Sequence, residues 1–213
     1  MEQMYSVFLD LKLKKCLVVG GGKVAARKVS SLLYCGAAVT VVSPVLSPEL
    51  EEMAAAQEIQ YFQEQYKVKH LQGAFLVISA TDDQVTNNIV ANDCFARDIL
   101  INVADAPALC NFFVPSLVSR GPLSIAISTE GKSPAFARLL REELEQSFSE
   151  DHGEFVRFLG ELRPLIMEQV RDPQKRKELF REMAGKEFFK LCRALPSDQR
   201  ELMAREMINR YCS

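Results

Sequence analysis

The most constraining feature of this chain is a glycine-rich stretch near its start, residues 14–28, which reads KKCLVVGGGKVAARK. Its first part, Cys16–Val19, has the length and β-branched content of a buried parallel strand, and a helical periodicity follows the glycines. In the spacing G-x-G-x-x-A, Gly20 takes the tight turn, Gly22 lets the backbone approach a pyrophosphate, and Ala25 lies where helix meets strand. The stretch therefore predicts a dinucleotide site at the amino end of that helix. A glycine triplet by itself is weak evidence; its place between strand and helix favours the nucleotide.

Length and composition set the broad class of the protein. A chain of 213 residues, 48% hydrophobic and 25% charged, can form one large domain or a medium domain with a smaller unit. The formal net charge of −2 argues against a general nucleic-acid or membrane-surface binder. Neither a membrane-spanning run nor a signal peptide is evident, and the six cysteines are scattered without a C-x-x-C motif. We expect a cytoplasmic protein with reduced cysteines and no metal site.

Strands and helices alternate along the first half of the chain. The expected strands are 5–11, 16–19, 37–42, 59–62, 73–80 and 99–103, and the expected helices are 23–34, 47–57 and 85–97. Such alternation predicts an α/β fold, a Rossmann-like parallel sheet.

Several side chains and backbone groups at the ends of these strands are expected to hold the cofactor, NAD, because ligands bind at the carboxyl ends of parallel strands. Ser43 stands where an NAD-binding unit carries an acidic residue for the ribose, which leaves tolerance of NADP open. For the strand-end residues Thr81, Asp82 and Asn102, plain loop solvation is an equal alternative. The expected cofactor-binding set is Gly20, Gly21, Gly22, Lys23, Val24, Ser43, Pro44, Val45, Thr81, Asp82 and Asn102.

The pattern changes after residue 103. Two short strands flank Gly121-Pro122, and a helix is expected over 133–148. Further helices are expected at 154–170, 173–184, 186–194 and 197–211, with a kink or restart at Pro164. The composition shifts predict three parts: an NAD-binding domain at 1–112, a middle segment at 113–148, and a helical domain at 149–213.

Taken together, the motifs resemble those of the precorrin-2 dehydrogenase/sirohydrochlorin ferrochelatase family, the siroheme-synthase enzymes. The likeness runs from Tyr5 to about Phe148, and the tail is similar only in kind. The residues that carry it, in family order, are 16–28 (CLVVGGGKVAARK), 80–83 (ATDD), 102–107 (NVADAP), 112–116 (FFVPS), 122–123 (PL) and 131–142 (GKSPAFARLLRE).

The resemblance implies NAD-dependent oxidation of precorrin-2 to sirohydrochlorin, followed in some members by insertion of ferrous iron to give siroheme. It further implies a homodimer joined through the middle segment, with a tetrapyrrole cleft where the parts meet. The methyltransferase half that some bacterial relatives carry is not expected within these 213 residues.

The family's catalytic aspartate corresponds to Asp105, in a loop just beyond the strand at 99–103. A carboxylate there could accept a proton as hydride leaves the macrocycle. The alternative from the residues alone is an Asp-Ala-Pro turn whose side chain caps local backbone.

The resemblance also assigns residues of the middle segment. The substrate carries eight carboxylates, so Arg120, Lys132, Arg138 and Arg141 are expected to bind it, although for each a solvated helix or loop position is the alternative. Ser128 and Thr129 lie where relatives carry hydroxyl residues, one of which can be phosphorylated; solvent-facing hydroxyls at a strand end are the alternative.

Two other functions fit parts of the pattern. One is the dehydrogenase step alone, with iron inserted by a separate protein. The other is a nucleotide-sensing module with a helical partner-binding tail, against which Asp105 and the stretch 133–142 speak.

Overall fold

The computed structural model describes residues 4–212, which divide into two compact units at residues 114 and 115. We call residues up to Val114 the first unit and those from Pro115 the second unit. The finer division into parts at 112/113 and 148/149 stays a prediction.

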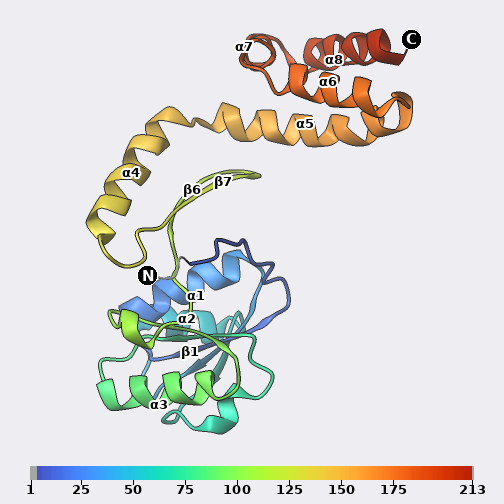
Figure 1. Cartoon of the computed structure of the whole chain (residues 1–213). Helices are drawn as coiled ribbons and strands as arrows, with labels where there is room; N and C mark the ends of the chain where they lie inside the picture. Colours follow the sequence, from blue (N-terminus) through green and yellow to red (C-terminus); the bar gives the residue numbers. More distant parts are fainter. Residues whose placement is uncertain (1–3, 213) are drawn as a thin grey trace. The chain divides into compact units, whose positions relative to one another are not determined.

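The first unit is a five-stranded parallel sheet with helices on both faces (Figure 1). Its strand order is β3-β2-β1-β4-β5, which matches the first five positions of the Rossmann order 3-2-1-4-5-6 and confirms the predicted fold class. The strands are β1 Lys15–Val19, β2 Ala38–Val42, β3 Gln60–Phe62, β4 Leu76–Ser79 and β5 Leu100–Val103. The helices are α1 Lys23–Tyr34, α2 Pro48–Ala55 and α3 Gln84–Phe95, with short 3₁₀ turns η1 Val68–Leu71 and η2 Pro107–Leu109.

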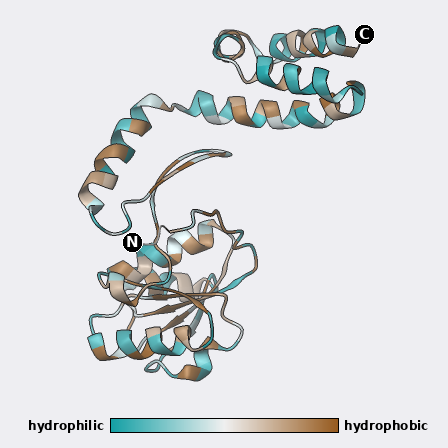
Figure 2. Cartoon of the chain, viewed as in Figure 1, coloured by the Kyte–Doolittle hydropathy of each residue, from teal (hydrophilic) through white to brown (hydrophobic). Residues whose placement is uncertain are grey.

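Alternate residues of the central strands supply two separate cores. Cys16 and Val18 of β1 pack with α1 and α2, whereas Leu17 and Val19 pack with α3. All four are at most 3% exposed, because the sheet is covered on both faces. The strands accordingly stand out as hydrophobic in Figure 2. This double coverage leaves the carboxyl ends of the strands as the edge where loops can build a site.

The strand expected over 5–11 is absent, and this prediction was wrong. The described residues 4–10 are exposed and lie in no strand. A segment with alternating apolar and polar residues forms a strand only where a neighbouring strand can pair with it. Here the chain enters the sheet through a turn in which the Lys14 N–H donates to the Leu11 carbonyl oxygen. The strand expected over 73–80 is also shorter, since β4 begins at Leu76.

The second unit begins with an antiparallel hairpin of β6 Ser116–Arg120 and β7 Leu123–Ile127, joined at Gly121. Five helices follow: α4 Pro134–Ser147, α5 Glu150–Gln169, α6 Pro173–Met183, α7 Lys186–Ala194 and α8 Ser197–Cys212. The expected start at 154 was wrong, and so was the restart that was one alternative at Pro164; the other alternative, a kink, stays a prediction. Helix α5 begins at Glu150, behind its N-cap Ser149, and is assigned continuously through Pro164.

The helical tail has its own core, in which Ile166, Leu179, Met183 and Ile208 are almost fully buried. Phe155, Phe158 and Phe180 pack against it. Most of these apolar side chains are therefore used for packing within the second unit.

Two glycines of α5 differ in what surrounds them, and this gives a paired stability prediction. A Cβ at Gly153 would lie 2.1 Å from the Arg120 carbonyl oxygen of β6, whereas a Cβ at Gly160 meets nothing within 4 Å. We expect Gly153→Ala to destabilise the second unit by about 1–3 kcal/mol. Gly160→Ala should stabilise it by about 0.5–1 kcal/mol through helix propensity. Chemical denaturation of both variants checks this, and equal effects would contradict the close approach of α5 to β6.

Candidate functional site

The glycine turn between β1 and α1 is held by two close backbone contacts. Gly20 has a φ of +118° and donates its N–H to the Val42 carbonyl oxygen at 2.9 Å; a Cβ there would lie 2.4 Å from the Ala80 oxygen. At Gly21 a Cβ would lie 1.9 Å from the Val45 oxygen. The first two glycines are therefore required by the packing of the loops after β2 and β4.

Gly22 is different, because a Cβ added there would meet nothing within 4 Å. It is the N-cap of α1, it provides no side-chain cap, and the first turn of the helix carries no acidic residue. The first N–H groups of α1 are thus free for a ligand, and the helix dipole favours an anion there. An open space beside such an N-terminus fits the pyrophosphate of a dinucleotide.

A cleft of about 1100 Å³ opens at this turn, at the carboxyl ends of β1, β2 and β4. Every predicted cofactor residue except Asn102 lines it, and so does Asp105. The lining also includes Leu46, Ser47, Gln65, Tyr66, Asp83, Val85, Thr86, Ile89 and Ala104. Tertiary structure thus gathers segments from residue 19 to residue 105 around one space, large enough for a cofactor.

Asn102 does not line this cleft. It is 8% exposed, and its amide nitrogen donates to the Phe112 carbonyl oxygen at 3.1 Å and to Cys110 Sγ at 3.6 Å. The predicted cofactor contact of Asn102 finds no support in this geometry; the side chain instead ties β5 to the chain that follows it.

Asp105 lies in the turn after β5, exposed, with a left-handed φ of 58°. The half-buried Lys28 of α1 is close enough to interact with it electrostatically: burial and Arg27 lower the pKa of Lys28, while the Asp105 carboxylate and Cys110 oppose that shift. A basic group therefore lies within electrostatic range of the Asp105 carboxylate. Lys28 was not among the predicted site residues. It lies four residues after Val24 in the same helix, and therefore on the same helix face, which was a usable signal.

The hydroxyl of Ser43 is already engaged within the loop. Its Oγ donates to the Val45 carbonyl oxygen at 2.7 Å, and the side chain is buried beside Gly21. Ser43 therefore supports the glycine turn, and its predicted contact with the ribose stays a prediction.

The segment after β3 forms a further wall of the cleft, which the sequence did not reveal. Gln65 and Tyr66 line the cleft, and Tyr66 donates its hydroxyl to Asp93 of α3 at 3.1 Å. Next to them, the Glu64 carboxylate accepts from Lys67, Lys69 and the buried His70, at 2.5, 2.8 and 3.0 Å. These three contacts to Glu64 hold the polar segment after β3 in one loop conformation.

The Glu64 cluster predicts an acid-range loss of stability. Hydrogen bonds from Lys67, Lys69 and His70 lower the pKa of Glu64 from 4.5 to about 2. A carboxyl whose pKa is lowered by folding stabilises the native state above its unfolded pKa, and that contribution is lost as the pH falls from about 4.5 toward 2. Glu64→Gln should flatten the pH dependence of the urea midpoint in this window, whereas Glu58→Gln, at an exposed carboxyl, should not. Parallel curves for wild type and Glu64→Gln would contradict the assignment.

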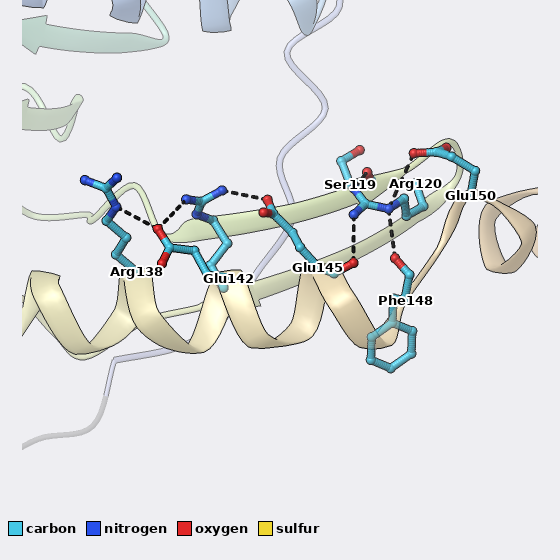
Figure 3. A network of polar contacts seen from close by, with 8 residues as sticks. Ser119, Arg120, Arg138, Glu142, Glu145, Phe148 and Glu150 are labelled. Carbon is cyan, nitrogen blue, oxygen red and sulfur yellow. Dashed lines mark hydrogen bonds and ion pairs between the residues drawn. The ribbon is translucent and has the colours of Figure 1, made fainter.

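The predicted substrate-binding cations lie in the second unit and have local partners, which Figure 3 shows for Arg120 and Arg138. Arg120 donates to the carbonyl oxygens of Phe148 at 2.8 Å and Glu145 at 3.1 Å, and so caps the end of α4. All four form ion pairs: Arg120 with Glu150, Arg138 with Glu142, Arg141 with Glu145, and Lys132 with Glu130.

The hydroxyls predicted as phosphorylation sites are used in a turn. Ser128 Oγ accepts from the Glu130 N–H and Thr129 Oγ1 from the Ser133 N–H, both at 3.1 Å. This is the capping arrangement expected of Ser and Thr, and their modification stays a prediction.

Comparison with known proteins agrees with this geometry. Residues 7–116 match a family model described as "Putative NAD(P)-binding", and residues 120–147 match one described as "Sirohaem biosynthesis protein central". The chain is 32% identical to a solved structure titled "SirC, precorrin-2 dehydrogenase", with a TM-score of 0.80 over 98% of this chain and 100% of that one. The chain belongs to the precorrin-2 dehydrogenase family.

Longer relatives extend this picture. The siroheme synthase of Methylobacillus flagellatus is 43% identical over 171 residues, 80% of this chain and 37% of the relative. That of Photobacterium profundum is 34% identical over 203 residues, 95% of this chain and 43% of the relative. The chain thus spans about two fifths of the length of these siroheme synthases. As a member of the precorrin-2 dehydrogenase family, it carries an NAD-binding unit in its first half.

Proposed function

We propose that this chain oxidises precorrin-2 to sirohydrochlorin with NAD. The observation that carries the proposal is that Asp105 and the glycine turn line one cleft in the first unit. Membership of the precorrin-2 dehydrogenase family supports it, as does the name of the relative that matches over its whole length.

The residues of the cleft fit the cofactor. The free N–H groups at Gly22, Lys23 and Val24 would hold the pyrophosphate, and the loop Ser43–Val45 would border the adenosine ribose. Thr81 and Asp82 would close the opposite wall. NAD, when bound, supplies the hydride acceptor.

Asp105 would then act as the general base that accepts the proton. Oxidation of the macrocycle removes a hydride and a proton, and a carboxylate at the mouth of the cleft can accept that proton as the carbon–hydrogen bond breaks. The remaining protein groups orient the reactants.

One absorbance experiment tests the proposal. The purified chain is given NAD and precorrin-2, and ferrous ion is added afterwards. Formation of NADH and sirohydrochlorin in equal amounts is expected; no spectral change would reject the dehydrogenase and favour a nucleotide-sensing module. A further change on adding iron, faster than without protein, would support the iron insertion that stays a prediction here.

A tetrapyrrole substrate and a homodimer belong to the same proposal. Leu117 of β6 and Phe136 and Leu139 of α4 are about half exposed, which supports a second copy covering them. Sedimentation should show a dimer that Phe136→Ser weakens more than Leu202→Ser, a change at an exposed position of α8; equal behaviour would count against this surface.

The helices bear on the question of a membrane-spanning segment. Among those of residues 4–212, none is long and apolar enough to cross a membrane. The predicted cytoplasmic location stays a prediction.

A further inference from the structure

We propose that Cys110 and Asn111 are positioning residues that clamp the Asp105 turn to the edge of the sheet. This inference rests on the proposed function, because it assigns these residues to the orientation of the carboxylate that would take the proton. Neither side chain lines the cleft, so neither is expected to touch substrate or cofactor.

The clamp begins with an open sheet edge. β5 is the last strand of the order β3-β2-β1-β4-β5, so the outward N–H and C=O groups of this strand and its lead-in need partners other than a neighbouring strand. Asn111 supplies three of them. Its side-chain oxygen accepts from the Ile101 N–H at 2.7 Å, its amide nitrogen donates to the Ile99 oxygen at 3.0 Å, and its own N–H donates to the Ile101 oxygen at 3.1 Å.

Cys110 continues this pairing along the edge. The Val103 N–H donates to its Sγ at 3.1 Å, and the thiol has the carbonyl oxygens of Val103 and Ala106 as acceptors, each at 3.4 Å. The Asn102 amide nitrogen reaches the same sulfur at 3.6 Å. Burial raises the pKa of the thiol, so this sulfur keeps the proton that it donates.

These contacts bracket the Asp105 turn from both sides. Val103 and Ala106 flank the turn, and one sulfur contacts the backbone of both. Apart from the ladder between β4 and β5, backbone hydrogen bonds of this turn run from the Ala104 N–H to the Ser79 oxygen and from the Ala106 N–H to the Val103 oxygen. Asp105 itself has a left-handed φ of 58°. This conformation costs an aspartate free energy, so it persists only where the surrounding structure imposes it. The thiol is therefore well placed to impose it.

The test removes the sulfur and follows the turn and the reaction separately. In Cys110→Ala, amide exchange at residues 103–106 should speed up, while exchange in β1 stays at the wild-type rate. The kcat for precorrin-2 oxidation should fall by about 10- to 100-fold with little change in the Kd of NAD, because a small displacement of a catalytic group has this effect. Cys110→Ser keeps a hydrogen-bond donor and acceptor on a shorter bond, so its exchange rates and its kcat should lie between those of wild type and Cys110→Ala. The control is Cys35→Ala, which removes an exposed thiol and should leave both measurements unchanged.

A double-variant cycle decides whether the effect passes through Asp105. In the Asp105→Asn background, Cys110→Ala should cost no further activity. An equal loss in both backgrounds, wild-type exchange at 103–106, or a parallel loss of NAD affinity would overturn the proposal. Should Cys110→Ala not fold, Asn111→Asp takes its place in both measurements, because it keeps the acceptor for Ile101 and loses the donor to Ile99. The exchange measurement needs no substrate, so it tests the clamp even if wild-type protein fails to oxidise precorrin-2.

Discussion

Asp105→Asn is expected to lower the kcat for precorrin-2 oxidation by about 10²- to 10⁴-fold, the usual contribution of a general acid or base. Asparagine tolerates the left-handed backbone of this position and keeps the size of the side chain, so the turn should stay folded. What is lost is the oxygen that can take a proton. Stopped-flow absorbance at saturating NAD and precorrin-2 measures the change.

The affinity for NAD separates this effect from damage to the cleft. The Kd of NAD, measured by calorimetry, should stay within about twofold of wild type, because the nucleotide is held mainly at the glycine turn. Asp98→Asn is a matched control, since Asp98 is also exposed with a left-handed φ of 53° but does not line the cleft. Near-normal turnover by Asp105→Asn would remove this residue from the mechanism and return it to the role of a turn residue.

Gly21→Ala and Gly22→Ala are expected to fail in different ways, although they are neighbours. At Gly21 a Cβ would lie 1.9 Å from the Val45 oxygen and 2.7 Å from Ser43 Oγ. Backbone on one side and a buried side chain on the other cannot yield cheaply, so we expect a loss of about 3 kcal/mol in the free energy of unfolding. Thermal and urea unfolding of the first unit measure this loss.

Gly22→Ala should leave folding nearly unchanged, because its φ of −85° suits alanine and its Cβ would meet nothing within 4 Å. The methyl group would instead occupy the space proposed for the pyrophosphate. The Kd of NAD should therefore rise by about 10- to 100-fold, the equivalent of 1–3 kcal/mol of overpacking. Undiminished NAD affinity in Gly22→Ala would place the phosphates elsewhere.

Local sequence was sufficient where short-range physics decides. The apolar strands at 16–19 and 37–42, the glycine turn and α1 follow from residue type and period, and their order predicts the parallel sheet. It failed at 5–11, where the alternation is present but the described residues 4–10 have no neighbouring strand, and at the start of α5, which lies at Glu150 and not at 154. At 5–11 the outcome depends on a pairing strand distant in the sequence.

Residue types and their spacing were enough to predict the fold class, the family motifs and which residues follow each strand. Tertiary structure alone decided that Gln65 and Tyr66 join the cleft, that Asn102 turns away from it, and that Cys110 and Asn111 cover the edge of β5. The reason is that strand-end residues share an edge by topology, whereas side-chain direction and edge pairing depend on contacts between segments. No local pattern records those contacts.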